Sequence, residues 1–130
     1  MKPKVLLIVE DDKTLMEALK EKFSVKDFSI LEAMDAESAV DVALKNHPDL
    51  ILLDIILPRG NGVMAMDKIR EDNWGKNVPI IILSNLNPND RMVSEVVREQ
   101  PAYYLLKAET PIDDVLEKVK EVLREKQNQG

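Results

Sequence analysis

The stretch from Asp49 to Gly62 reads DLILLDIILPRGNG, and it places an acidic residue, Asp54, inside a run of Leu and Ile. Burial of a lone carboxylate is costly, so the charge of Asp54 requires compensation by other groups. A near-continuous apolar run is typical of a strand that is covered on both faces of a parallel sheet. The residues LPRGNG then predict a sharp turn before a helix that starts near Val63.

Apolar runs of the same kind recur along the chain, and they fall at residues 5–9, 28–31, 50–53, 78–83 and 103–106. Between and after these runs, apolar residues follow the spacing of a helix, which predicts helices near 15–23, 36–44, 63–70, 92–97 and 112–123. The alternation of strands with helices indicates an α/β domain with a parallel sheet and right-handed crossovers.

Residues with capping chemistry precede three of the predicted helices. Asp35 is placed to cap the helix that begins with AES. In NPND we expect Asn87 at the N-cap and the following proline at the first helical position. In TPID we expect Thr110 at the N-cap, with Asp113 closing a capping box.

Length and composition limit the class of protein. With 130 residues, of which 45% are hydrophobic, the chain fits one domain with a real core. We expect this domain to cover residues 1–126 and a frayed polar tail to cover 127–130. The formal net charge of −6 argues against direct nucleic-acid binding. The chain has no cysteine, no signal-peptide pattern and no apolar run of membrane-spanning length, so we expect a cytoplasmic protein that binds no membrane.

Polar side chains end four of the predicted strands, namely Glu10, Asp11 and Asp12, then Asp54, then Ser84, then Lys107. Ligands of open parallel sheets bind at the carboxyl ends of the strands, so we expect these groups to meet at one edge. Clustered carboxylates suit a hard cation such as Mg²⁺, and a lysine beside them can pair with a phosphate oxygen. A carboxylate can also act as a nucleophile, which makes Asp54 a candidate for an aspartyl-phosphate. Asp12 alone equally fits a helix cap.

The motifs VLLIVEDD, HPDLILLDIILPRGNG, VPIIILSN and YYLLK together resemble the receiver domain of two-component response regulators, in particular single-domain receivers of the chemotaxis-regulator type. The resemblance covers essentially the whole chain. It implies a flavodoxin-like (βα)5 fold, in which a doubly wound parallel five-stranded sheet has the strand order 2-1-3-4-5. It also implies a phosphorylated switch rather than a turnover enzyme.

The resemblance assigns a metal site to the acidic residues. It implies that Asp54 is the phosphoacceptor and that Glu10 and Asp11 serve Mg²⁺ (or Mn²⁺), with Asp11 as the more direct ligand. Asp54 itself and the backbone carbonyl of Ile56 match the remaining protein ligands.

The resemblance also assigns the groups that respond to phosphorylation. Ser84 and Lys107 match the hydroxyl and the lysine that hold the phosphoryl oxygens, and Ser84 with Tyr104 matches the switch pair. The implied partners are a histidine kinase or histidine phosphotransfer protein, and a downstream protein that binds the surface formed by helix 4, strand 5 and helix 5. We expect a monomer or weak homodimer.

Several positions depart from the family pattern. Ala108 follows Lys107 where the family usually has a proline after a cis bond, and a cis bond before alanine costs roughly 2.5–4 kcal/mol. We therefore expect either a trans bond with a reshaped loop or a strained bond. Asn85 replaces a small residue, and QPAY at 100–103 lacks the usual glycine. Ile56 and Leu86 are both apolar, and we hypothesise that they screen the site from attacking water.

Other functions remain open from the sequence. A receiver-like interaction module that is never phosphorylated fits if Ala108 and Asn85 disable the site. An Asp-dependent phosphohydrolase usually carries a second Asp where this chain has Ile56, and a flavin site would not tolerate the acidic EDDKT segment. The chain is either a stand-alone domain or part of a longer regulator. We expect His47 to be a loop or C-cap residue and Trp74 to be a loop anchor.

Overall fold

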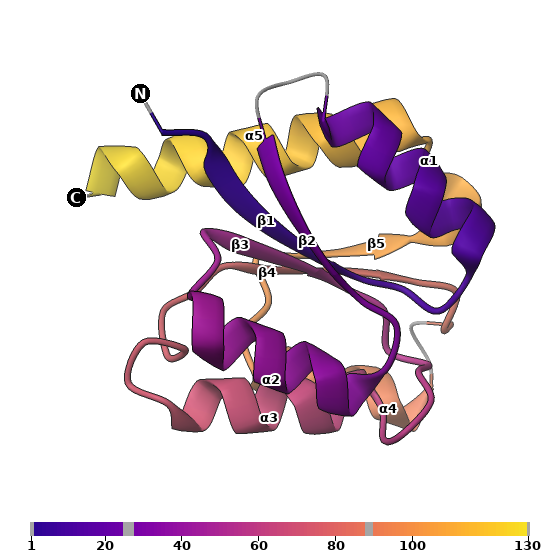
Figure 1. Ribbon diagram of the computed structural model, residues 1–130. Coiled ribbons are helices and arrows are strands. Elements are labelled where there is room, and N and C mark those ends of the chain that lie inside the picture. The colour runs from indigo at the N-terminus through magenta and orange to yellow at the C-terminus, as the bar shows by residue number, and fades with distance from the viewer. Residues whose placement is uncertain (1, 25–27, 88–89, 130) are drawn as a thin grey trace.

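The computed structural model describes residues 2–24, 28–87 and 90–129, and in that part of the chain strands and helices alternate (Figure 1). The elements are β1 (Lys4–Val9), α1 (Lys13–Ser24), β2 (Phe28–Ala33), α2 (Ala36–Asn46), β3 (Leu50–Leu53), α3 (Gly62–Glu71), β4 (Ile80–Ser84), α4 (Arg91–Arg98), β5 (Tyr103–Leu106), the short 3₁₀ helix η1 (Lys107–Glu109) and α5 (Ile112–Gln129). The predicted α/β class is confirmed.

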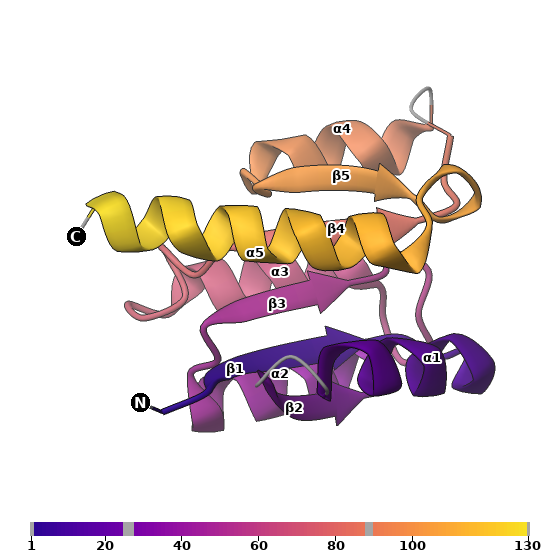
Figure 2. The same cartoon turned by 90° about the horizontal axis from the view of Figure 1, so that it is seen from above.

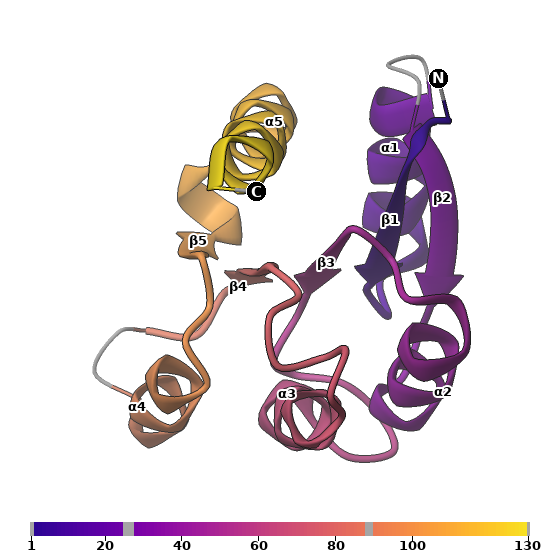
Figure 3. The ribbon, with the colours of Figure 1, turned by 90° about the vertical axis from the view of Figure 1, so that its left-hand side faces the viewer.

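The strands form one parallel sheet in the order β2-β1-β3-β4-β5. Helices α1 and α5 cover one face of the sheet, and α2, α3 and α4 cover the other (Figure 3). This is the doubly wound, flavodoxin-like arrangement with the predicted strand order. In such a sheet the order reverses between β1 and β3, and ligands bind beside the carboxyl ends of those strands.

Helices on both faces explain why the strands have no polar alternation. In β1, Leu7 and Val9 belong to the core under α2 and α3, whereas Leu6 and Ile8 belong to the core under α1 and α5. All four side chains are at most 1% exposed. Strands that are buried on both sides need apolar residues at every position, as the sequence has.

Two predicted caps are confirmed and one is wrong. Asp35 caps α2 and accepts a hydrogen bond from the Ser38 amide at 2.7 Å, and His47 is the C-cap residue of the same helix, in the left-handed conformation. Asn87 does not cap α4. The N-cap is Asp90, whose carboxylate accepts a hydrogen bond from the Met92 amide at 2.9 Å, so the helix starts later than the sequence suggested. The proline expected at the first helical position lies outside the described residues.

The predicted capping box at the start of α5 is also wrong. The carbonyl of Pro111 accepts hydrogen bonds from the amides of Asp114 and Val115, and Asp113 forms an ion pair with Lys22 of α1 instead. At the other end, α5 continues to Gln129, so residues 127–129, assigned to a frayed tail, have helical backbone. The domain limits themselves stay a prediction.

Candidate functional site

The predicted functional residues lie where the strands end. All strands run in one direction, so the segments after β1, β3, β4 and β5 meet at one edge of the sheet (Figure 2). Glu10 and Asp11 follow β1, Asp54 follows β3, Ser84 ends β4 and Lys107 follows β5. The groups that the sequence predicts to meet at one edge therefore do lie there.

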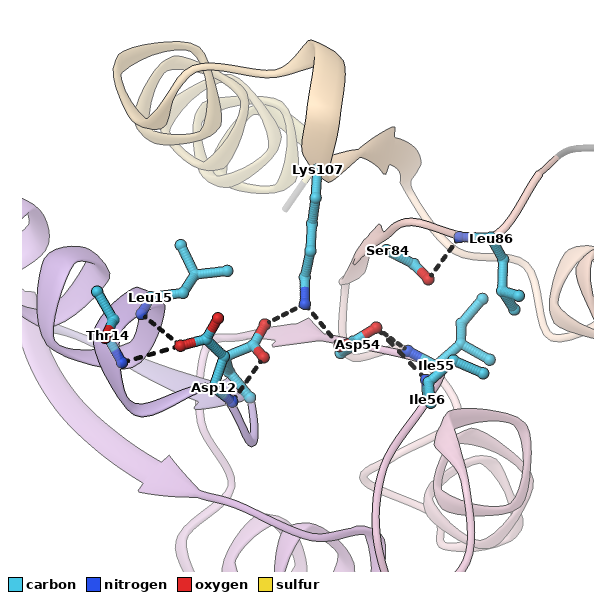
Figure 4. A network of polar contacts seen from close by, with 10 residues as sticks. Asp12, Thr14, Leu15, Asp54, Ile55, Ile56, Ser84, Leu86 and Lys107 are labelled. Atoms are coloured by element: carbon cyan, nitrogen blue, oxygen red, sulfur yellow. Dashed lines mark hydrogen bonds and ion pairs between the residues drawn. The ribbon is translucent and has the colours of Figure 1, made fainter.

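Lys107 connects two of the acidic side chains. Its Nζ lies 2.7 Å from Asp54 Oδ2 (Figure 4). The same atom lies 2.7 Å from Glu10 Oε1. Both carboxylates are almost fully buried, at 2% exposure for Glu10 and 5% for Asp54. The ammonium therefore supplies the compensation that buried carboxylates require.

The remaining oxygens of the two acids accept backbone hydrogen bonds. Asp54 Oδ1 accepts from the amides of Ile55 at 2.7 Å and Ile56 at 3.4 Å. Glu10 Oε2 accepts from the Asp12 amide at 3.0 Å. Among the described residues, every buried side-chain nitrogen and oxygen has a hydrogen-bond partner. Asp54 is thus held in one orientation, with Oδ2 directed to the lysine.

Burial and pairing act in opposite directions on the titration of this cluster. Burial raises the pKa of Glu10 above its usual value, and the hydrogen bonds from Lys107 and the Asp12 amide offset only part of this effect. Burial acts to lower the pKa of Lys107, but its hydrogen bonds with Asp54 and Glu10 outweigh that effect and leave the pKa raised. Lys107 therefore stays charged at neutral pH.

Glu10, Asp11 and Asp54 form an acidic group that fits a divalent cation. One carboxylate oxygen from each residue lies within 4.8 Å of the others, with Glu10 and Asp54 buried and Asp11 exposed. Oxygen ligands at the rim of a sheet, with one side open to water, suit Mg²⁺, which binds through few carboxylates and keeps several waters. The Ile56 carbonyl as a further ligand stays a prediction.

Asp12 has a different role from its two acidic neighbours. Its Oδ1 accepts hydrogen bonds from the amides of Thr14 at 2.9 Å and Leu15 at 3.2 Å, so it caps α1 (Figure 4). This helix-cap interpretation is the one that the sequence left open beside a role in the site. The cap orients the first turn of α1 beside Asp11.

Ser84 and Tyr104 are linked through the backbone of Leu86. The Leu86 amide donates to Ser84 Oγ at 3.2 Å, and the Tyr104 hydroxyl donates to the Leu86 carbonyl at 3.2 Å. Ser84 is fully buried, and burial raises the pKa of the Tyr104 hydroxyl. A movement of Ser84 would therefore reach Tyr104 through one residue.

The unusual residues around Lys107 leave its position intact. The described residues contain no cis peptide bond, so the Lys107–Ala108 bond is trans, and the chain turns through η1. The QPAY segment manages without glycine because Gln100 itself adopts the left-handed conformation, with φ of 57°. Asn85 is exposed beside the site. Of the two expected outcomes for Ala108, the structure has the trans bond.

Sequence reasoning missed the role of Gly62 next to Asp54. This residue starts α3, and its amide donates to the Ile55 carbonyl at 2.7 Å. A Cβ atom at this position would lie 2.5 Å from the Asp54 carbonyl oxygen and 2.7 Å from Ile55 Cα. The only available signal was a glycine at a predicted helix start, which also fits an ordinary turn.

The fold and the site define a class of protein: a doubly wound parallel α/β domain with acidic side chains and a lysine at the carboxyl edge of its sheet. The chain belongs to the family of response regulator receiver domains, whose model matches residues 6–120. It is thus a domain of two-component signalling, as the sequence motifs indicated.

Curated relatives are response regulators of greater length. The chain is 32% identical over 82 residues to response regulator MprA of Mycobacterium sp. (strain KMS), which covers 63% of this chain and 35% of MprA. It is 34% identical over 90 residues to response regulator protein GraR of Staphylococcus haemolyticus, which covers 68% of this chain and 39% of GraR. The matches thus span little more than a third of these relatives.

Solved structures of receiver domains superpose over nearly the whole chain. A putative response regulator from Chloroflexus aurantiacus has a TM-score of 0.83 at 27% identity, covering 95% of this chain and 99% of that one. A two-component response regulator from Clostridium difficile has a TM-score of 0.82 at 30% identity, covering 93% and 96%. The strand order and helix placement are therefore those of the family.

The family itself has general properties. Receiver domains are signalling domains, bind Mg²⁺ at an acidic pocket and interact with histidine kinases or phosphotransfer proteins. None of the helices in the described ranges has the length and apolar character needed to cross a bilayer.

Proposed function

We propose that the chain is a phosphoryl-accepting switch in which Asp54 is the acceptor. An Asp54 carboxylate oxygen attacks the phosphorus of a phosphohistidine on a partner histidine kinase or phosphotransfer protein. A P–O bond to Asp54 forms as the P–N bond breaks, and the imidazole leaves and takes up a proton. Catalysis then consists of in-line positioning and charge neutralisation, which is what most phosphoryl transfers require.

The contact of Lys107 with both Asp54 and Glu10 carries this proposal. The Lys107 ammonium lies 2.7 Å from the acceptor oxygen, so it can pair with a phosphoryl oxygen once the phosphoryl group is bound to Asp54. Glu10, Asp11 and Asp54, with the Ile56 carbonyl, would hold Mg²⁺, which neutralises phosphate charge when it is bound. Ser84 would donate its hydroxyl proton to another phosphoryl oxygen.

The link from Ser84 to Tyr104 supplies a route to the surface. When Ser84 turns toward the phosphoryl group, it gives up the hydrogen bond from the Leu86 amide, and the Leu86 carbonyl that holds the Tyr104 hydroxyl shifts with it. The Tyr104 ring then changes position on β5, between α4 and α5. A local charge change thereby biases a two-state element, as in other phosphorylation switches.

The proposed partners follow from this route. A downstream protein would read the α4–β5–α5 surface, where Val97 of α4 is 59% exposed and β5 forms an edge of the sheet. We propose that the chain acts in the cytoplasm as a monomer or weak homodimer and binds neither nucleic acid nor membrane.

Mass spectrometry after incubation with acetyl phosphate and Mg²⁺ tests the assignment. The native chain should gain the mass of one phosphoryl group, and Asp54→Asn should not. Asp49→Asn is the matched control, since Asp49 lies at the opposite end of β3 and its carboxylate accepts a hydrogen bond from the Val5 amide. Equal labelling of the native chain and Asp54→Asn would contradict the proposal. So would a native chain that neither acetyl phosphate nor a phosphorylated histidine kinase can label.

A further inference from the structure

Arg70, in the last turn of α3, binds four backbone carbonyls from two separate connections. Its Nη1 donates to the carbonyls of Gly75 and Val78, both at 2.7 Å, in the segment between α3 and β4. Its Nε donates to the Glu99 carbonyl at 3.0 Å and its Nη2 to the Gln100 carbonyl at 3.4 Å, in the segment between α4 and β5. One side chain of α3 therefore joins the α3–β4 and α4–β5 connections, away from the acidic site.

One of these contacts satisfies the C-cap carbonyl of α4. The last carbonyls of a helix have no partner within the helix, and Glu99 is the C-cap residue of α4. A guanidinium offers five donors in a fixed plane, carries a charge that favours the negative end of a helix dipole and does not lose its proton in proteins. Arg70 thus holds this end of α4 in place.

The rest of α4 contacts the core through one face only. Of its residues, Val93 and Val96 are buried, while Val97 is 59% exposed. The helix lies beside α3 at the margin of its layer, on the side of β5 (Figure 3). Its amino-terminal end follows the carboxyl end of β4 at Ser84, and its carboxyl-terminal end leads to the start of β5. The two ends of α4 therefore lie near opposite ends of the strands.

The same clamp fixes the entrance to β5. Gln100 adopts the left-handed conformation, and two residues later the Ala102 amide donates to the Ile80 carbonyl at 2.7 Å. The strand that follows carries Tyr104 and leads into Lys107. A fixed start of β5 therefore contributes to the position of Tyr104, the second residue of the strand, and of Lys107, which follows its end.

We propose that Arg70 is a positioning residue that forms a fixed pivot for α4. With the carboxyl end clamped, a change at Asp54 turns the helix about this end and displaces its amino-terminal end most. The inference rests on the proposed function, because the change at Asp54 is the phosphorylation proposed above. It adds a residue on α3, distant from the phosphoryl group, that shapes the response of the α4–β5–α5 surface.

Backbone NMR of the native chain tests the pivot without any mutation. On addition of beryllofluoride and Mg²⁺, amide shifts should change at Met92 and Val93 and stay nearly constant at Glu99 and Gln100. Shift changes as large at Gln100 as at Met92 would overturn the pivot and leave the proposed function standing. No shift change anywhere in the native chain would overturn both.

Hydrogen exchange of two variants tests the part played by Arg70 itself. The amides of Glu99 and Gln100 donate to the carbonyls of Val96 and Val97 at 3.0 Å, so their exchange reports on the end of α4. In Arg70→Met we expect roughly tenfold faster exchange at both amides, because local opening becomes easier. The amide shift changes caused by beryllofluoride should then extend along α4 to Val97. Arg70→Lys keeps the charge with fewer donors and should fall between.

Arg98→Met is the matched control, since Arg98 is an exposed arginine in the last turn of α4. It should leave exchange and the shift pattern close to those of the native chain. Identical patterns in Arg70→Met and Arg98→Met would overturn the role of Arg70, and so would failure of Arg70→Lys to recover part of the native pattern.

Discussion

Lys107 Nζ lies 2.7 Å from Asp54 Oδ2, although β4 separates the strands that these residues follow. The lysine side chain spans the end of β4 and meets Glu10 at the same distance. One ammonium therefore forms ion pairs with two buried carboxylates from different strands. Removal of this ammonium is costly because both carboxylates then stay buried without their counter-charge.

We expect Lys107→Met to lose roughly 3–5 kcal/mol of stability at neutral pH, as for other broken buried ion pairs. Urea unfolding in the presence of a chelator measures this loss, and added Mg²⁺ should restore part of it by replacing the missing positive charge. Lys68→Met, at an exposed position of α3, is the control. A loss no larger than that of the control would mean that Lys107 does not compensate the two acids.

The sequence predicts the site well where each residue is defined by the strand that it follows. Asp54 and Lys107 are placed by the ends of their apolar strands, and a parallel sheet brings those ends together whatever the loops do. Lys107 reaches Asp54 although the bond to Ala108 is trans, because Lys107 directly follows β5. Fold class and site geometry therefore follow from local patterns.

Two kinds of feature do not follow from the sequence: the choice between two possible N-cap residues, and contacts between residues that are far apart in the chain. Asn87 and Asp90 are both good N-cap residues, so the residue types alone do not decide which of them starts α4. Arg70 contacts Glu99 and Gln100, 29 and 30 residues away, through backbone carbonyls, which carry no sequence signal. The packing of Gly62 against Asp54 is invisible for the same reason.

Glu10→Gln should stabilise the chain near pH 7 and weaken divalent-cation binding. Burial raises the pKa of Glu10, so the folded state binds a proton there more readily than the unfolded state. The stability from this group is present below the ordinary Glu pKa and is lost as pH rises through the folded pKa. Glutamine removes that loss, and we expect a gain on the order of 1 kcal/mol near pH 7.

Thermal unfolding of both chains across pH, with a chelator present, tests this sign. The advantage of Glu10→Gln should shrink toward zero near pH 4, where the native Glu10 is protonated. Glu17→Gln, on the exposed side of α1, should show no such trend. An advantage that grows on acidification would contradict the direction of the pKa shift.

Ile56→Asn should shorten the lifetime of the phosphorylated chain. The Ile56 side chain is 54% exposed next to Asp54, and an apolar group there excludes water that would attack the phosphoryl group. An amide can orient such a water, so we expect dephosphorylation about threefold to tenfold faster, or roughly 1 kcal/mol off the barrier. Decay of label from the purified phosphorylated chain measures the rate. An unchanged rate, with an unchanged unfolding temperature, would rule out the screening role.

His47→Asn should change the fluorescence of Trp74 without disrupting α2. The two rings stack with centroids 4.5 Å apart and an angle of 11°, and asparagine tolerates the left-handed conformation of this C-cap residue. Loss of the stack should brighten Trp74 emission and lower stability by about 0.5–1.5 kcal/mol. Asn46→Ala, one residue earlier, is the control. Emission equal to that of the native chain would show that the stack does not form.

The position of Trp74 in the fold makes its fluorescence a poor reporter of phosphorylation. Trp74 follows α3 and precedes β4, so it lies at the edge of the sheet opposite Asp54. Beryllofluoride with Mg²⁺ should therefore leave its emission nearly unchanged, whereas Tyr104 resonances should move. A large change in Trp74 emission would indicate a response that crosses the whole sheet.

Gly62→Ala should destabilise the chain and disturb Asp54 together. The added Cβ would lie 2.5 Å from the Asp54 carbonyl oxygen and 2.7 Å from Ile55 Cα, so backbone rather than a flexible side chain has to move. We expect a loss of about 1–3 kcal/mol, as for other overpacked sites, and weaker Mg²⁺ binding because the shifted backbone carries the acceptor. Val63→Ala, in the same turn of α3, is the control, since it removes packing against the core and adds no atom beside Asp54. Chemical denaturation and Mg²⁺ titration followed by the Ile55 and Ile56 amides measure both quantities. If Gly62→Ala retained native stability and Mg²⁺ affinity, the close approach of α3 to the acceptor would have no bearing on the site.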